Sequence, residues 1–155
     1  MSDPPDIDDV QAAARRIAGH VHRTPVFTSH TVDELVGCRV HFKGEHLQRA
    51  GAFKVRGATN AVQALDADVA ARGVAAHSSG NHAAALALAA RTRGIPCHVV
   101  MPSDAPLVKQ RATAGYGAEI VLCEPTLEAR EEVLAEVLGR TGATEIHPYD
   151  HPHVI

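Results

Sequence analysis

The chain has 155 residues, of which 45% are hydrophobic, and its formal net charge is −3 at pH 7. A globular chain of this length can bury roughly 68–70% of the surface that its unfolded state exposes. It has no basic run and no interleaved aromatic residues, which argues against a nucleic-acid partner, and no apolar stretch approaches the about eighteen residues needed to cross a bilayer.

The cysteines and the first residues bear on the compartment. Cys38, Cys97 and Cys123 are odd in number and include no C-x-x-C pair, so they predict neither a zinc ribbon nor a redox motif. The opening residues MSDPPDIDDV are acidic and lack the apolar core of a signal peptide. We expect a soluble protein of the reducing cytoplasm.

The first third of the chain contains helical and extended segments. Apolar residues recur every three or four positions from Ile7 to Ile17, which predicts an amphipathic helix that Asp6 or Asp8 can cap. The segments that follow are expected to be an extended connector over 22–27, a strand over 39–45 and a helix over 53–65.

From residue 74 onward, strands and helices alternate with short links between them. The expected strands are 74–77, 97–101, 119–123 and 144–147, and the expected helices are 81–91, 105–114 and 126–138. Gly94, Gly117 and Gly142 stand between a helix and the next strand, where C-capping favours glycine. This alternation predicts an α/β fold, with an open, twisted parallel sheet flanked by helices in three layers (αβα).

One strand-to-helix junction, HSSGNH at 77–82, is unusually polar. Ligands of such sheets bind beyond the carboxyl ends of the strands. Free N–H groups at the helix start, together with the side chains of Ser78, Ser79, Asn81 and His82, would form a cradle for a carboxylate or a phosphate. The alternative is that Ser79 or Asn81 simply caps the helix.

A second junction places Lys54 where a turn becomes a helix, between Phe53 and Val55. A lysine nucleophile must be neutral, whereas an ordinary lysine pKa of about 10.4 leaves only about one amine in a few thousand uncharged at pH 7. Apolar neighbours and the positive end of a helix dipole both favour a neutral amine. The alternative is an ordinary surface lysine that happens to follow a phenylalanine.

Together, the two junctions point to one chemistry. An amine able to form a Schiff base and a cradle for an amino-acid carboxylate are two of the parts that pyridoxal-phosphate catalysis requires. The stretches GAFKVRGATNAV, HSSGNHAAALALAA, GIPCHVVMPSDAPLVKQRATAGYGAEIVLCEP and HPYDHPHVI resemble, in this order, the first half of the serine/threonine dehydratases and serine racemases. That family has the type II, tryptophan-synthase-β-like, pyridoxal-phosphate fold, and the likeness runs from about His22 to the last residue.

The resemblance implies a role for each motif residue. Lys54 would hold the cofactor covalently, with Phe53 packing nearby, and Asn81 would contact the phenolic oxygen of the cofactor. Ser78, Ser79, Asn81 and His82 would receive the substrate carboxylate, and Ser79 would supply a second acid/base on the cofactor face opposite the lysine.

The activity that the resemblance implies is dehydration of L-threonine or L-serine to a 2-oxo acid and ammonia, by a homodimer in the full-length parent. A racemase would differ only by reprotonation from the side of Ser79. A β-replacement enzyme such as a cysteine synthase is less favoured, because those enzymes typically carry threonine where this chain has His82.

The sequence also departs from the family pattern. Ala52 stands where many relatives have serine, and the glycine-rich loop that cradles the cofactor phosphate would lie beyond Ile155. We therefore expect a fragment of a longer enzyme: 1–72 as opening elements of a large domain, 73–150 as a small α/β domain, and 151–155 returning to the large domain. The rival reading is a non-catalytic module that binds an amino acid or a partner chain.

Two further signals are weak. His147, Asp150, His151 and His153 crowd together in HPYDHPH, but two prolines break any regular spacing, so a solvated loop is preferred and no metal site is expected. A G-x-G-x-x-G fingerprint is missing from the sequence, which argues against a dinucleotide-binding domain.

Overall fold

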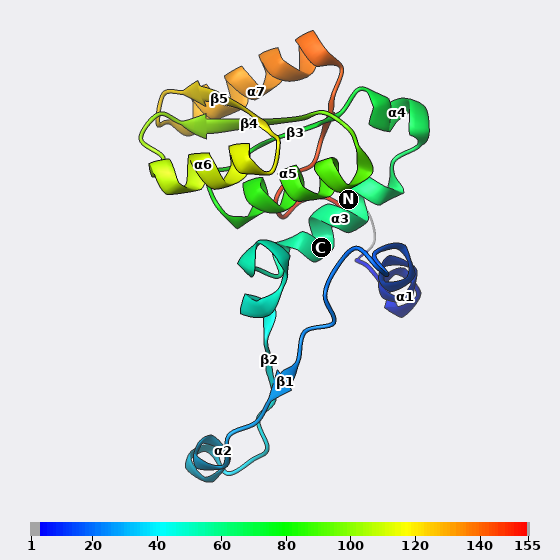
Figure 1. The fold of residues 1–155 in the computed structure, drawn as a ribbon, viewed down its shortest axis with the longest axis vertical. Helices are drawn as coiled ribbons and strands as arrows, with labels where there is room; N and C mark the ends of the chain where they lie inside the picture. Colours follow the sequence, from blue (N-terminus) through cyan, green and yellow to red (C-terminus); the bar gives the residue numbers. More distant parts are fainter. Residues whose placement is uncertain (1–3, 155) are drawn as a thin grey trace.

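A computed structural model describes residues 4–154 of the chain (Figure 1). The first half contains α1 (Ile7–Arg16), β1 (Val26–Phe27), α2 (His30–Val36), β2 (Phe42–Lys43), the short 3₁₀ helices η1 (Glu45–Leu47) and η2 (Arg49–Gly51), α3 (Lys54–Ala64) and α4 (Ala67–Ala71). The second half contains β3 (Val74–His77), α5 (Asn81–Arg93), β4 (Cys97–Pro102), α6 (Leu107–Gly115), β5 (Glu119–Cys123), α7 (Leu127–Thr141) and β6 (Thr144–Glu145).

The second half forms one parallel sheet with strand order β5-β4-β3-β6. Helices α5 and α6 pack on one face and α7 on the other, while α3 packs against α5 from outside (Figure 1). The α/β fold with helices on both faces of a parallel sheet is thus confirmed, and α5, α6 and α7 each lie within a few residues of their expected ranges.

Alternation along the strands divides the core between the two faces. Val74 and Ala76 of β3 pack in the larger cluster with α3 and α5, whereas Ala75 between them joins Leu134 and Val137 of α7 in the smaller cluster. Successive side chains of a strand point to opposite faces, so strands that are buried on both faces read as continuous apolar runs.

The first half differs most from expectation. β1 and β2 pair antiparallel over two residues each, and they carry α2 at the tip of an arm that projects from the body of the molecule (Figure 1). The expected strand 39–45 is reduced to Phe42–Lys43, because the Val40 N–H donates instead to the carboxylate of Asp33, in the first turn of α2, at 2.8 Å. Helices α2 and α4 were not expected from the sequence.

A hydrogen-bond network ties the base of this arm to α3. The Gln48 side chain accepts from the His22 N–H and donates to the His22 carbonyl, at 2.9 Å in each case. Arg56 donates to both carboxylate oxygens of Glu45, at 2.7 and 2.9 Å. This Arg56 contact, opposed by burial and helped by Thr24, lowers the pKa of Glu45 to about 2. The network holds in place the turn that precedes Lys54, the first residue of α3.

Candidate active site

Lys54 is the first residue of α3, immediately after a sharp turn. Ala50 and Gly51 have φ of 55° and 69°. Positive φ is uncommon for alanine, and the pair redirects the chain from η2 into the helix. The half-buried Lys54 side chain donates from Nζ to the Pro148 carbonyl at 2.7 Å, and Nζ lies 5.3 Å from the centroid of the Phe53 ring.

The flanking apolar side chains do not enclose the amine as expected. Phe53 is 58% exposed, and Val55, at 1% exposed, points into the core instead. Successive residues at a helix start project about 100° apart, so the two neighbours of a lysine cannot both cover it. The sequence motif located the amine correctly at a turn-to-helix junction, but its surroundings come from elsewhere in the chain.

The second junction links β3 to α5 and is open. Gly80 is the N-cap and no side chain caps the helix, so the alternative that Ser79 or Asn81 is a cap is wrong. Ser78 Oγ accepts from the Gly80 N–H at 3.3 Å. A Cβ on Gly80 would meet no atom within 4 Å. Because no side chain caps α5, the N–H groups of its first turn remain available as donors to an anion.

His82 has a different setting from its neighbours in the motif. Its side chain is 3% exposed and its Nε2 lies 2.8 Å from the Ile146 carbonyl, so Nε2 carries the proton. Nδ1 is buried without a hydrogen-bond partner among the described residues. Burial lowers the pKa of His82 to about 4, against the opposing effect of the Ile146 hydrogen bond and with help from the charge of Lys54. The imidazole is therefore neutral at pH 7.

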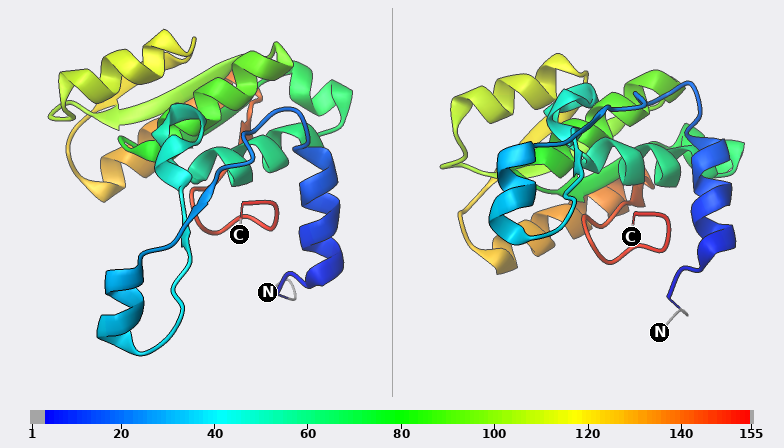
Figure 2. Two further views of the ribbon diagram at one scale, coloured as in Figure 1. Left: turned by 60° about the horizontal axis from the view of Figure 1, so that its bottom comes forward. Right: turned by 90° about the horizontal axis from the view of Figure 1, so that it is seen from below.

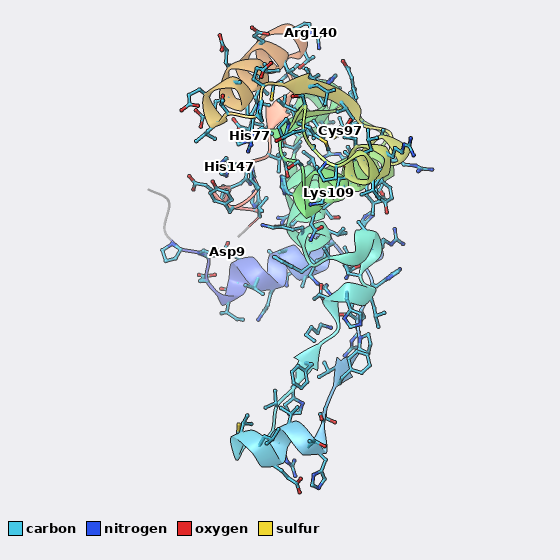
Figure 3. All side chains as sticks on the ribbon, turned by 90° about the vertical axis from the view of Figure 1, so that its left-hand side faces the viewer. Asp9, His77, Cys97, Lys109, Arg140 and His147 are labelled. Carbon is cyan, nitrogen blue, oxygen red and sulfur yellow. The ribbon has the colours of Figure 1, made fainter. Side chains whose placement is uncertain are left out.

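The two junctions meet at one short segment that follows β6. The Ile146 carbonyl accepts a hydrogen bond from His82, and the Pro148 carbonyl accepts one from Lys54. The amine and the buried imidazole are therefore held by the same stretch of three residues. His77, at the end of β3, and His147 lie beside each other (Figure 3), with ring centroids 6.1 Å apart. The parallel pairing of β3 with β6 brings this segment to the carboxyl edge of the sheet.

A cavity of about 590 Å³ adjoins the lysine between α1, α3 and the last described residues. Phe53, Lys54 and Asn60 line it from α3 and its start, Ile17 from the end of α1, and His153 from the final segment. Its volume is within the range of small-molecule sites.

The histidines of the final segment form turns rather than a ligand set. His147 Nδ1 accepts from the Asp150 N–H at 2.9 Å, and His151 Nδ1 accepts from the His153 N–H at 3.2 Å. Within residues 4–154, no three His, Cys, Asp or Glu side chains are grouped so that they could hold a metal ion. Over the same residues, no helix has the length and apolar character that a membrane crossing requires.

Comparison with known proteins places the chain in a family. The model of the family described as "Pyridoxal-phosphate dependent enzyme" matches residues 17–155. A beta-hydroxyaspartate dehydratase of Paracoccus denitrificans (strain Pd 1222) is 52% identical over 151 residues, which are 97% of this chain and 48% of the relative. A serine racemase of Oryza sativa subsp. indica is 47% identical over 97% of this chain and 44% of its own length.

Solved structures that superpose on this chain are enzymes of similar name. Maize serine racemase superposes with a TM-score of 0.93 at 48% identity, over 96% of this chain and 45% of that one. A threonine deaminase from T.th. gives 0.88 at 45% identity, over 97% and 47%. The chain belongs to the pyridoxal-phosphate-dependent enzyme family, and it spans about half the length of the curated relatives it matches.

The residues present fit the cofactor of this family. Pyridoxal phosphate offers an aldehyde and several anionic oxygens. The chain provides a lysine amine at Lys54 and an uncapped helix start with open space at Gly80. Sequence reasoning missed the Ile146 and Pro148 carbonyls, because backbone acceptors leave no mark on residue type.

Proposed function

We propose that this protein is the lysine-bearing part of a pyridoxal-phosphate-dependent ammonia-lyase that converts L-threonine or L-serine to a 2-oxo acid and ammonia. The observation that carries the proposal is the meeting of Lys54 and the open β3–α5 junction at residues 146–148. An amine and an anion cradle at one edge of a parallel sheet are what an amino-acid substrate of this cofactor requires.

In this proposal each candidate site residue has a defined role. Lys54 would hold the cofactor covalently, and its amine, when free, would take the proton from Cα of the substrate. The first-turn N–H groups of α5, with Ser78, Ser79 and Asn81, receive the substrate carboxylate, while His82 stays neutral and contributes its backbone at the same turn. Phe53 would pack beside the cofactor, and Asn81 would also contact its phenolic oxygen. The bound cofactor supplies a ring that accepts electron density as the Cα proton leaves.

The substrate class follows from a shared chemical feature. The names of the relatives refer to hydroxyaspartate, serine and threonine, and all three amino acids carry a hydroxyl group on Cβ. Loss of that hydroxyl as water after Cα deprotonation would leave an enamine, which would tautomerise to an imine. Hydrolysis of the imine would then give the 2-oxo acid and ammonia. 3-Hydroxyaspartate therefore joins threonine and serine among the substrates to be assayed.

Serine racemase is the second candidate function. Its support is the likeness to the rice and maize racemases, at 47% and 48% identity. A racemase needs a second proton donor on the face opposite the lysine, and the half-buried Ser79 is the hydroxyl that we assign to that role.

The organisation of the whole protein is part of the same proposal. Residues 1–72 would begin a large domain, 73–150 would form a small one, since the four-stranded sheet lies entirely within that range, and 151–155 would return to the large domain. A reducing cytoplasm suits the free thiols of Cys38, Cys97 and Cys123. A homodimer would cover apolar side chains of the arm, such as Leu35, which is 80% exposed.

Trapping of the cofactor tests the central assignment. The protein would be mixed with pyridoxal phosphate, reduced with borohydride and mapped by peptide mass spectrometry. We expect the label on Lys54 in preference to Lys43 and Lys109, the other lysines of the sequence. Equal labelling of the three amines would reject Lys54 as the cofactor lysine. Formation of 2-oxo acid from threonine, serine and 3-hydroxyaspartate by the full-length parent, measured against its Lys54→Ala variant, tests the reaction and its substrate.

A further inference from the structure

One face of α3 carries Lys54, Gly57 and Asn60, which are spaced three residues apart. Residues three apart on a helix are neighbours on its surface. The final segment, residues 147–154, runs beside this helix (Figure 2), and each of the three residues touches it.

The contacts differ in kind. Lys54 Nζ donates to the Pro148 carbonyl at 2.7 Å, and Asn60 Nδ2 donates to the His153 carbonyl at 2.9 Å. Between them, the segment passes so close to Gly57 that an added Cβ would lie 2.6 Å from the Val154 carbonyl oxygen. The helix thus provides two donors for the segment and, between them, a position without a side chain.

Asn60 is the more firmly held of the two donors. It is 7% exposed, in a helix whose other inward residues are mostly apolar, and its Oδ1 accepts a hydrogen bond from Arg16 at the end of α1. Its amide therefore joins α1, α3 and the final segment. A buried side chain with both ends of its amide bonded has little freedom to turn.

We propose that Asn60 is a positioning residue for Lys54: it docks residues 147–154 on α3, and the docked Pro148 carbonyl holds the Lys54 amine in place. The contribution of this restraint to catalysis rests on the proposed function, whereas the restraint itself concerns only this chain. Reaction at Nζ competes with the Pro148 hydrogen bond, so release of the segment raises the reactivity of the amine.

Asn60→Asp is a near-isosteric test. The carboxylate keeps an acceptor for Arg16, but it loses the donor to His153 and places an oxygen against that carbonyl. Competitive acetylation with a limiting amount of acetic anhydride would measure labelling of Lys54 relative to the exposed Lys109. We expect the ratio to rise roughly three- to tenfold, the range that loss of one net hydrogen bond implies. Hydrogen exchange in residues 147–154 should accelerate with it.

Thr59→Val is the matched control. Thr59 is a neighbouring buried residue of α3, 3% exposed, and the change to valine is similar in size. We expect the wild-type labelling ratio and wild-type exchange in residues 147–154. This control separates release of the segment from a general loosening of the helix.

Gly57→Ala disturbs the segment by a second route, because its new Cβ collides with Val154 while alanine favours the helix over glycine. It should raise the ratio in the same way, even if Asn60→Asp fails to fold. An unchanged ratio in a folded variant, or an equal rise at Lys54 and Lys109, overturns the inference. Because acetylation uses no pyridoxal phosphate, these outcomes are distinct from a failed cofactor trap, which overturns the proposed function instead.

Discussion

His82 should make the protein lose stability as the pH falls from 7 to 5. The side chain is 3% exposed and its pKa is lowered from 6.5 to about 4, chiefly by burial. In the unfolded chain the imidazole takes a proton below about pH 6.5, whereas the folded protein does not accept it until about pH 4. The stabilisation from the neutral histidine is therefore complete above pH 6.5 and is lost progressively toward pH 4.

The size of the effect follows from the two pKa values. At pH 5 the unfolded imidazole is almost fully protonated and the folded one is mostly neutral, so proton linkage lowers the free energy of unfolding by about 2 kcal/mol relative to pH 7. His151 acts in the same direction, because burial, aided by His153 and His147, also lowers its pKa. The contribution of His82 must therefore be isolated with a variant.

His82→Gln is the suitable variant, since a glutamine amide can still donate to the Ile146 carbonyl but does not titrate. Urea unfolding at half-unit pH steps, followed by circular dichroism, gives the free energy of unfolding of both proteins. We expect the wild type to lose about 2 kcal/mol more than the variant between pH 7 and pH 5. Parallel curves would refute the reasoning, because they would mean that His82 is not a buried neutral base.

Three further predictions concern the base of the arm, the β3–α5 junction and the core. Arg56 holds the pKa of Glu45 at about 2, so the stabilisation from the ionised Glu45 is present above pH 4.5 and is lost toward pH 2. In urea unfolding, Glu45→Gln should therefore weaken the loss of unfolding free energy between these two pH values. In the full-length parent, Ser79→Ala should suppress serine racemisation more than 2-oxo acid formation, by about 10²–10⁴-fold, in paired chiral and oxo-acid assays. Equal losses would leave Ser79 as a carboxylate ligand only. Leu86→Ala, at a fully buried position of α5, should cost about 2–5 kcal/mol of unfolding free energy, and a cost below about 1 kcal/mol would contradict tight packing there.

The alternating half of the fold was predictable because its signals are local. The run VAAH is long enough for a buried strand, and the residues that follow to Arg93 have helical composition. The arm was not predictable in the same way. Its strands β1 and β2 are two residues long, which is too short for an alternating pattern of apolar and polar residues to be recognised. They pair with each other although α2 lies between them in the sequence.

The features of the candidate site also separate into those that local sequence predicted and those that it did not. The motifs located Lys54 and the β3–α5 junction, because glycine, serine and asparagine at a strand-to-helix turn indicate open backbone donors. They did not reveal that His82 is buried against Ile146, or that Phe53 leaves the amine uncovered. Those properties depend on which segment of the chain lies across each junction.

The sequence by itself determined the order of strands and helices from residue 74 onward, the family motifs and the amine that the proposed chemistry uses. Only the tertiary structure decided what that amine contacts: Lys54 meets Pro148 across 94 residues, and Asn60 meets His153 across 93. The physical reason is that periodicity and capping act through side chains within a few residues of each other. The acceptors in these long-range contacts are backbone carbonyls, which every residue carries, so only their position in the folded chain distinguishes them.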